Sequence, residues 1–109
     1  MANIYRNAKV DFTNTDNTTV YTSPSNSRAI VKSILVSDDS GSGDSINVTL
    51  TDASAAVFSL FKTKAIASNA TTELITQQIV LQESEILKAQ ATTAGRLHMV
   101  VSLLEINRD

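Results

Sequence analysis

The sequence predicts an all-β domain, an antiparallel β-sandwich with jelly-roll-like connections and seven to nine strands. β-Branched residues are abundant, with nine Val, nine Ile and thirteen Thr, and these side chains favour a pleated surface. Apolar segments recur along the chain, and clusters of turn residues separate them about every 8–12 residues, as in sandwiches and small barrels. No apolar stripe of helical period persists, even across residues 72–88, where Leu, Ile, Gln and Glu would suit a helix.

The chain divides into residues 1–13, an N-terminal extended arm or first strand, and residues 14–109, a single β-sandwich domain. In the first part, Ala8, Val10 and Phe12 alternate with charged residues, so one face of an extended segment is apolar. A turn cluster of Asn, Thr and Asp then leads into the sandwich.

Residues 28–38 have the composition of a central strand, with apolar side chains on both faces. A short strand over 19–23 precedes them and ends at Pro24, which lacks a backbone N–H donor. Residues 39–45 hold two of the three glycines and predict a loop.

Residues 46–51 alternate strictly between apolar and polar side chains, which predicts a strand with one exposed face. A tight turn follows at 52–54. Residues 56–63 predict another strand, and its Phe58 and Phe61 are expected in the core.

The second half of the chain carries further segments with strand character, which are residues 71–76, 78–82, 86–91 and 97–104. The first two are either two short strands or one bent strand. Residues 65–70 are compatible with a loop or with one helical turn. The glycine that ends 92–95 predicts a hairpin turn, and the last strand should be central because it is apolar on both sides.

Charge and composition argue against several partners. The net charge is −2, the pI is about 5.2, and Lys and Arg are scattered singly, so no basic patch for nucleic acid is expected. The N-terminus lacks the pattern of a secretion signal, and no apolar run approaches the roughly 20 residues that span a bilayer, so no membrane association is expected. Cysteine is absent, which excludes disulfides.

Candidate catalytic and metal-binding residues are few, and the expectation is no catalytic site, no cofactor and no metal. His98 is the only histidine, and we expect it to be structural or exposed. The loop 38–44 offers oxygen ligands but lacks the calcium-loop pattern, so a solvated turn is expected. The carboxylates considered as a hydrolytic pair are Glu73, Glu83, Glu85 and Glu105.

The N-terminal segment supplies the candidate contacts with a subunit or partner, which are Ile4, Tyr5, Val10 and Phe12. These side chains would be costly to leave in water as a patch. They are expected to pack either on the sandwich itself or on a neighbouring subunit as an added strand, and the sequence leaves both open.

Five segments taken in order resemble small virion structural proteins of tailed bacteriophages, particularly aquatic ones. They are Val20–Pro24, Ala29–Val36, Ile46–Leu50, Glu85–Gln90 and Leu97–Ile106. The resemblance extends over most of the chain and rests on the ordered set rather than on any single segment.

The resemblance implies a non-enzymatic β-sandwich of the virion, assembled in the host bacterial cytoplasm. It favours a capsid decoration (cement) protein, often trimeric, whose partners are the major capsid protein or other virion proteins. Neck, tail and baseplate components are the alternative. A carbohydrate-binding module ranks lower, because the chain has no Trp and only Tyr5 and Tyr21 remain to stack on sugars.

Overall fold

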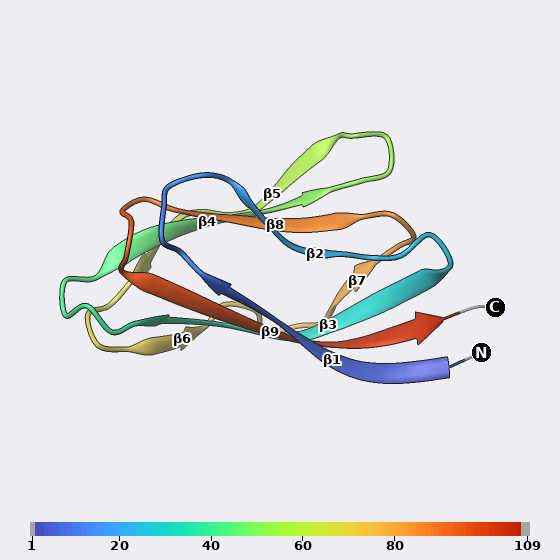
Figure 1. The fold of residues 1–109 in the computed structure, drawn as a ribbon, viewed down its shortest axis with the longest axis horizontal. Helices are drawn as coiled ribbons and strands as arrows, with labels where there is room; N and C mark the ends of the chain where they lie inside the picture. The colour runs from blue at the N-terminus through green and yellow to red at the C-terminus, as the bar shows by residue number, and fades with distance from the viewer. Residues whose placement is uncertain (1, 108–109) are drawn as a thin grey trace.

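The computed structural model describes residues 2–107, with side chains from residue 3 onward, and all of its regular elements are strands (Figure 1). They are β1 (Ala2–Asp11), β2 (Thr18–Thr22), β3 (Ser27–Asp38), β4 (Asp44–Thr51), β5 (Val57–Ile66), β6 (Thr71–Glu73), β7 (Ile79–Leu81), β8 (Ile86–Ala91) and β9 (Leu97–Asn107). No helix within residues 2–107 is long and apolar enough to cross a membrane.

Two antiparallel sheets form a sandwich, which confirms the predicted fold class. Sheet A has the order β1-β9-β3-β6, and β7 also pairs with β3. Sheet B has the order β2-β8-β4-β5. The chain passes from one sheet to the other at most connections, so neighbours in sequence are rarely neighbours in a sheet, as in a jelly roll.

The two longest strands, β3 and β9, form the centre of sheet A, as the sequence predicted. Their pairing runs from Ser27↔Asn107 to Asp38↔Leu97. A bulge between Val31 and Ser33 shifts the register by one residue. The buried positions therefore change from odd to even numbers at Ile34, which is why both faces of this strand looked apolar in the sequence.

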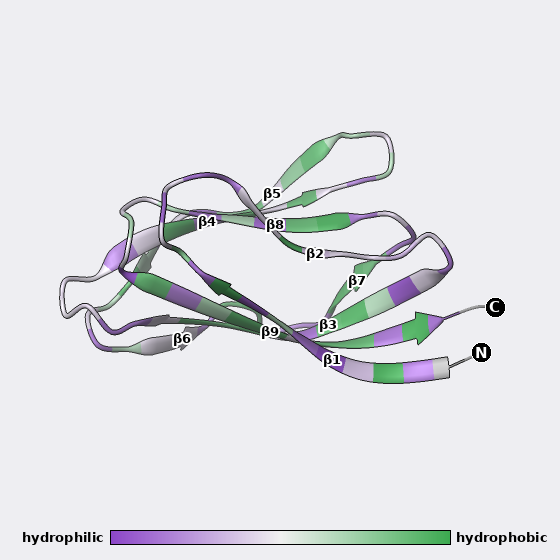
Figure 2. Ribbon diagram, viewed as in Figure 1, coloured by the Kyte–Doolittle hydropathy of each residue, from purple (hydrophilic) through white to green (hydrophobic). Residues whose placement is uncertain are grey.

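The core lies between the sheets and is built from their alternating inward side chains. Hydrophobic residues alternate with polar ones along the strands in Figure 2. The buried hydrophobic residues are Phe12, Ala29, Val31, Ile34, Val36, Ile46, Val48, Ile66, Leu74, Ile75, Leu81, Leu87, Ala89, Ala91, Leu97, Met99, Val101 and Leu103. Their burial supplies the main driving force for folding.

The structure between β5 and β8 decides between the alternatives that the sequence left open for residues 65–70 and for residues 71–82. β5 continues to Ile66, and residues 67–70 form a turn without helix. β6 and β7 are two short strands that pair with different parts of β3, opposite β9. Leu74 and Ile75 are buried between them, and the Leu74 N–H donates to the Ile34 carbonyl at 2.9 Å.

The turn after β8 is not the hairpin that its glycine suggested. β8 belongs to sheet B and β9 to sheet A, so residues 92–96 carry the chain between sheets. Gly95 has a φ of 78°, and its N–H donates to the Phe12 carbonyl at 2.8 Å. A positive φ marks a tight change of direction, and it does not reveal whether the next strand pairs with the previous one.

The prediction that Phe58 belongs to the core is also wrong. Its side chain is 53% exposed, whereas Phe61 packs against the core. The hairpin between β4 and β5 projects from the body of the sandwich in Figure 1, and Phe58 is the second residue of β5, next to the turn of that hairpin. A strand buries its inward side chains only where the opposing sheet covers it.

Candidate interaction surfaces

An apolar row crosses the outward face of sheet A. The backbone register places Tyr5 of β1, Leu104 of β9, Ile30 of β3 and Val80 of β7 side by side. Tyr5 is 75% exposed and Val80 is 54% exposed, while Leu104 and Ile30 are half-buried. We call these four side chains the apolar row; rigid strands hold them in line on the protein surface.

A second cross-strand line lies on the same face. Val100 and Leu35 are paired in register and partly exposed. Lys9 is the partner of Val100 on one side, and Glu73 is the partner of Leu35 on the other. This line is therefore apolar in its middle and carries opposite charges at its two ends.

The predicted contact residues are separated by the strand alternation. β1 pairs with β9 along its whole length, so residues 2–11 form the edge strand of this chain's own sheet A. Tyr5 points outward into the apolar row, whereas Ile4 and Val10 are half-buried on the inward side. Phe12 is 2% exposed and belongs to the core.

The sequence reasoning missed the other three members of the apolar row. A signal for Ile30 and Leu104 was present, since residues 28–38 and 97–104 carry apolar side chains on both faces. We expected both faces of these two strands to be buried, but only their inward face is covered, by the opposing sheet. Leu104, Ile30 and Val80 are instead brought together on the outward face by pairing between distant segments.

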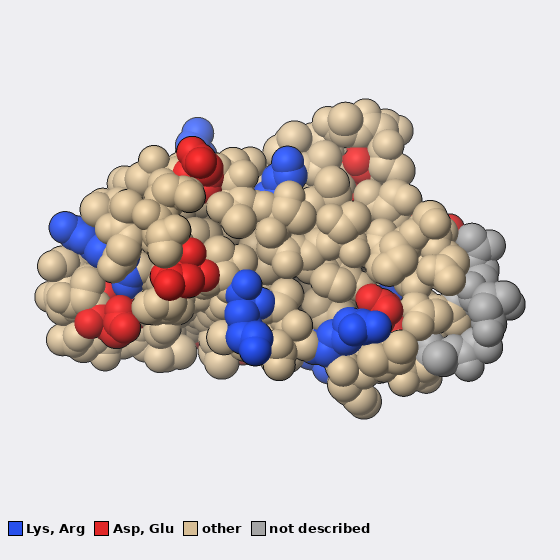
Figure 3. Space-filling view, in the orientation of Figure 1, with Lys and Arg blue, Asp and Glu red and all other residues tan. Residues whose placement is uncertain are grey.

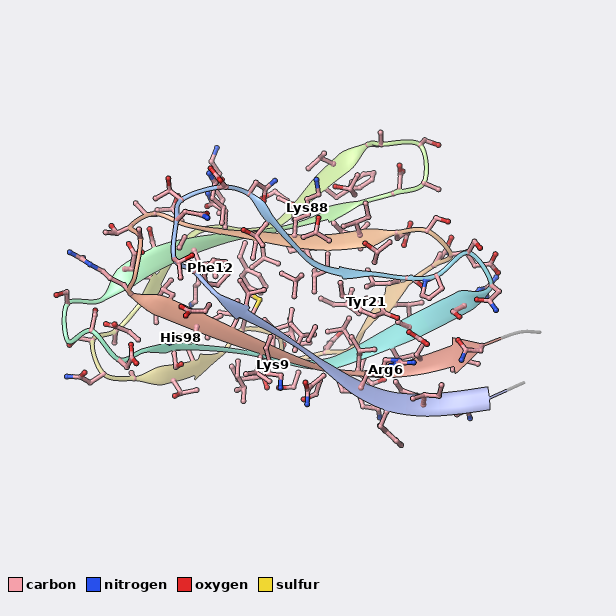
Figure 4. The ribbon with its side chains drawn as sticks, in the orientation of Figure 1. Arg6, Lys9, Phe12, Tyr21, Lys88 and His98 are labelled. Carbon is pink, nitrogen blue, oxygen red and sulfur yellow. The ribbon has the colours of Figure 1, made fainter. Side chains whose placement is uncertain are left out.

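A polar cluster joins the two sheets near one end of the sandwich. Glu105 of β9 is only 5% exposed, and its carboxylate accepts a hydrogen bond from the Tyr21 hydroxyl of β2. The Arg6 Nε of β1 lies 3.3 Å from Glu105 Oε1. Tyr21 and Arg6 lie close together in Figure 4. Burial, and then the hydrogen bond to this carboxylate, raise the pKa of Tyr21 above its ordinary value.

His98 lies on the outward face of sheet A between two carboxylates. Its Nε2 is 3.2 Å from Asp11 Oδ1, and its Nδ1 is 3.7 Å from Asp39 Oδ1. Both charged partners are acids, and a nucleophilic triad needs a hydroxyl or thiol on one ring nitrogen. The geometry accordingly places His98 where β9, the end of β1 and the loop after β3 meet.

The loop after β3 uses its carboxylate to shape itself. Asp38 Oδ1 accepts from the N–H and hydroxyl of Ser40 at 2.8 and 2.6 Å, and Oδ2 accepts from the Gly43 N–H at 2.5 Å. The Ser40 hydroxyl bond, with the backbone bonds, holds the pKa of Asp38 below its ordinary value against the opposing effect of burial. Among residues 2–107, no group of three or more His, Asp or Glu side chains is arranged to hold a metal ion.

Of the carboxylates considered for hydrolysis, Glu73, Glu85 and Glu105 make hydrogen bonds within the fold. The Glu73 carboxylate accepts from the Ile34 N–H at 2.8 Å, and Glu85 Oε1 accepts from the Gln82 N–H at 2.8 Å. Glu83 lies in the turn between β7 and β8, and Glu105 is engaged inside the sandwich. These engagements use the carboxylates as acceptors, which is a structural role.

Part of the outward face of sheet B differs from that of sheet A, because amide, hydroxyl and lysine side chains line it. A shallow groove of about 230 Å³ lies there, lined by Asn17, Asn47, Thr49, Ser59, Lys62 and Gln90. Figure 3 shows that charges of both signs are scattered over the face in view, with uncharged surface between them. The two outward faces of the sandwich thus offer different chemistry.

Comparison with known proteins identifies no family. No protein-family model matches the chain, and no curated protein matches it. Solved structures do match. A chain of the Bacillus endospore appendages, described as disulfide-linked pili, has a TM-score of 0.57 at 10% identity and covers 98% of this chain and 89% of its own.

Two phage structures also match the chain. A chain of the acid-stable capsid of Helicobacter pylori bacteriophage KHP30 has a TM-score of 0.54 at 11% identity, covering 99% of this chain and 95% of its own. A chain of the cyanophage Pam1 capsid asymmetric unit has a TM-score of 0.48 at 19% identity, covering 97% of this chain and 85% of its own. The pilus and KHP30 likenesses show a shared fold across nearly the whole chain.

Proposed function

We propose that this chain is a non-enzymatic structural protein of a bacteriophage virion, and specifically a decoration (cement) protein that binds the major capsid protein. The apolar row on the outward face of sheet A carries the proposal. Exposed apolar side chains that line up across several strands are typical of a protein-binding surface, whereas single exposed ones are ordinary.

The chemistry of this face fits a protein partner. Tyr5 adds a large rigid ring with a polar end, which suits an interface. Lys9 and Glu73 place opposite charges beside the apolar centre, and such charges orient a partner. Because the strands hold these side chains in place, little conformational freedom is lost on binding.

The fold likenesses support an assembly role. One relative in fold is a chain of a pilus and another is a chain of a phage capsid. The KHP30 match covers almost all of both chains, so that capsid chain is of similar length to this one. A small sandwich of this kind suits an accessory subunit placed on a shell.

The proposal includes a homotrimer. β1 is at one edge of sheet A, and β6 and β7 are at the other. An edge strand has backbone groups that can pair with a neighbouring chain. Pairing β1 of one subunit with the opposite edge of the next is head-to-tail, which is the arrangement that a cyclic trimer requires. Ile4 and Val10 would lie at that junction.

Binding to undecorated capsids tests the attachment face. Val80→Ser removes an apolar side chain from the apolar row, and Val57→Ser is its control, because Val57 is 63% exposed on sheet B. We expect the Val80 variant to lose at least tenfold in affinity and the Val57 variant to bind as the unsubstituted chain. Equal loss in both variants, or in neither, would contradict attachment through sheet A.

Cryo-electron microscopy of labelled virions tests the location. Density for this chain over the capsid lattice supports the decoration role. Mass photometry of the isolated protein tests the trimer separately, and a monomer or dimer would contradict it. Density confined to the neck, tail or baseplate would replace the decoration role with a component of that part. Absence from virions, with binding to a glycan array, would favour the carbohydrate-binding module.

A further inference from the structure

The groove on sheet B is built from two cross-strand rows. Thr49 of β4 lies in register between Lys88 of β8 and Ser59 of β5, and Asn47 lies opposite Gln90. These side chains point away from the core, since Val48 and Ala89 between them are buried. Figure 4 shows Lys88 on the outward side of β8.

One hydroxyl in this groove has no partner. Thr49 Oγ1 is buried from solvent and makes no hydrogen bond, and it is the one such side-chain atom among the described residues. Buried polar groups are normally paired, so an orphan in a groove needs an explanation. Because this atom is shielded from solvent, a ligand hydroxyl or carboxylate would become its partner only after a neighbouring side chain of the groove moves aside.

The backbone beside Thr49 is arranged around a bulge. Thr63 has a φ of 54°, a left-handed conformation that is rare for a β-branched residue. Asn47 Oδ1 accepts from the Thr63 N–H at 2.6 Å, across the register shift of β5. The bulge places Lys62 at the wall of the groove. Strained backbone of this kind clusters at binding sites.

The side-chain amides of Asn47 and Gln90 each use one polar atom in a hydrogen bond within the protein, so the other polar atom of each remains for a ligand. Because Asn47 accepts through Oδ1, its NH₂ group remains as a donor. The Gln90 Nε2 donates to the Thr15 carbonyl at 2.8 Å, so Oε1 remains as an acceptor. Together with the hydroxyls of Thr49 and Ser59, these atoms match the alternating donors and acceptors of sugar hydroxyls.

The positive charge at the groove favours an anionic sugar over a neutral one. Lys62 lines it and Lys88 adjoins it in register with Thr49, while none of the lining residues carries a carboxylate. We propose that the groove binds a saccharide that carries a carboxylate, such as a uronic acid. The lysines would balance the carboxylate, and the amides and hydroxyls would bind the sugar hydroxyls. This proposal is independent of attachment through sheet A, because it uses the opposite face.

Backbone amide NMR with trigalacturonate tests the proposal. We expect saturable shifts in β4, β5 and β8 around the groove. The fully methyl-esterified trisaccharide has the same hydroxyls without the charge, and it should bind at least tenfold more weakly. Lys62→Ala should reduce affinity for trigalacturonate at least tenfold, and Lys9→Ala, on sheet A, should leave it unchanged.

The Thr49→Val variant separates a ligand-binding hydroxyl from a structural one. Valine keeps the shape of threonine and removes the unpartnered hydroxyl, so the melting temperature should be unchanged or higher while affinity falls. A lower melting temperature would show that the hydroxyl supports the fold. Absence of saturable shifts, shifts centred on sheet A, or affinity unchanged by the Lys62 substitution would overturn the proposal. The capsid-binding assay uses none of these variants, so either proposal can fail alone.

Discussion

The Tyr21 hydroxyl donates to the buried carboxylate of Glu105, and this contact ties β2 of sheet B to β9 of sheet A across 84 residues of sequence. A buried carboxylate is costly unless it is paired and hydrogen-bonded, and Arg6 supplies the opposite charge from β1. The cluster therefore joins three strands and both sheets at one end of the sandwich.

Tyr21→Phe should destabilise the protein by about 1.5–3 kcal/mol, because a hydrogen bond to a buried charged group is lost. Urea unfolding measures the change. Tyr5→Phe removes the same hydroxyl from a 75% exposed ring, and it should change stability by less than about 0.5 kcal/mol. If both variants unfold at the same urea concentration, the Tyr21 contact does not contribute to stability.

The raised pKa of Tyr21 also predicts an alkaline effect. The folded state keeps the neutral phenol, so its contribution to stability is complete below the ordinary tyrosine pKa of about 10. Above that pH the unfolded state ionises first and the contribution is lost. The difference in unfolding free energy between the unsubstituted chain and Tyr21→Phe should therefore shrink as pH rises past 10. A constant difference from pH 8 to 11 would contradict this.

Phe12→Ala should cost about 3–5 kcal/mol, because it leaves a cavity in the core. Tyr5→Ala removes a side chain of similar size from the surface and should have little effect on the isolated protein. Thermal unfolding of the two variants compares packing with surface exposure directly. A stable Phe12 variant would show that this side chain does not anchor the N-terminal strand to the core.

The lowered pKa of Asp38 predicts acid sensitivity. Its contribution to stability is present above the ordinary Asp pKa of about 3.9 and is lost as pH falls below it. Unfolding free energy measured between pH 5 and pH 2 should fall less steeply for Asp38→Asn than for the unsubstituted chain. Asp16→Asn, at an exposed loop position, should keep the original slope. Identical slopes for all three would contradict the assignment.

Gly95 and Gly43 both lie in connections between strands and both have a positive φ, but the space around them differs. Gly95 has a φ of 78°, and a Cβ added there would meet no heavy atom within 4 Å, so Gly95→Ala should cost only the left-handed backbone, about 1–2 kcal/mol. Gly43 has a φ of 70°, and a Cβ there would lie 3.1 Å from the Ile66 carbonyl oxygen. Gly43→Ala should therefore be the more destabilising in thermal unfolding, and equal effects would show that the carbonyl moves aside.

The candidate contact surface was only partly predictable. Tyr5 was identified from the cost of exposing an apolar N-terminal segment, and the structure places it at the end of the apolar row. Phe12 belonged to the same sequence pattern but is in the core, because it lies on the inward side of the alternation, where its N–H still pairs with the Leu97 carbonyl at 3.1 Å. The groove on sheet B left no motif, since its lining comes from the loop before β2 and from β4, β5 and β8.

The sequence by itself determined the kind of element and most strand positions, because alternation and turn chemistry are local properties. The 46–51 segment is an example, since its alternating pattern is visible without any partner. Only the tertiary structure decided which strands pair and why Phe58 stays exposed. It also decided that the bulge between Val31 and Ser33 changes which set of β3 side chains is buried. Those outcomes depend on backbone pairing between segments far apart in the chain and on how far one sheet covers the other.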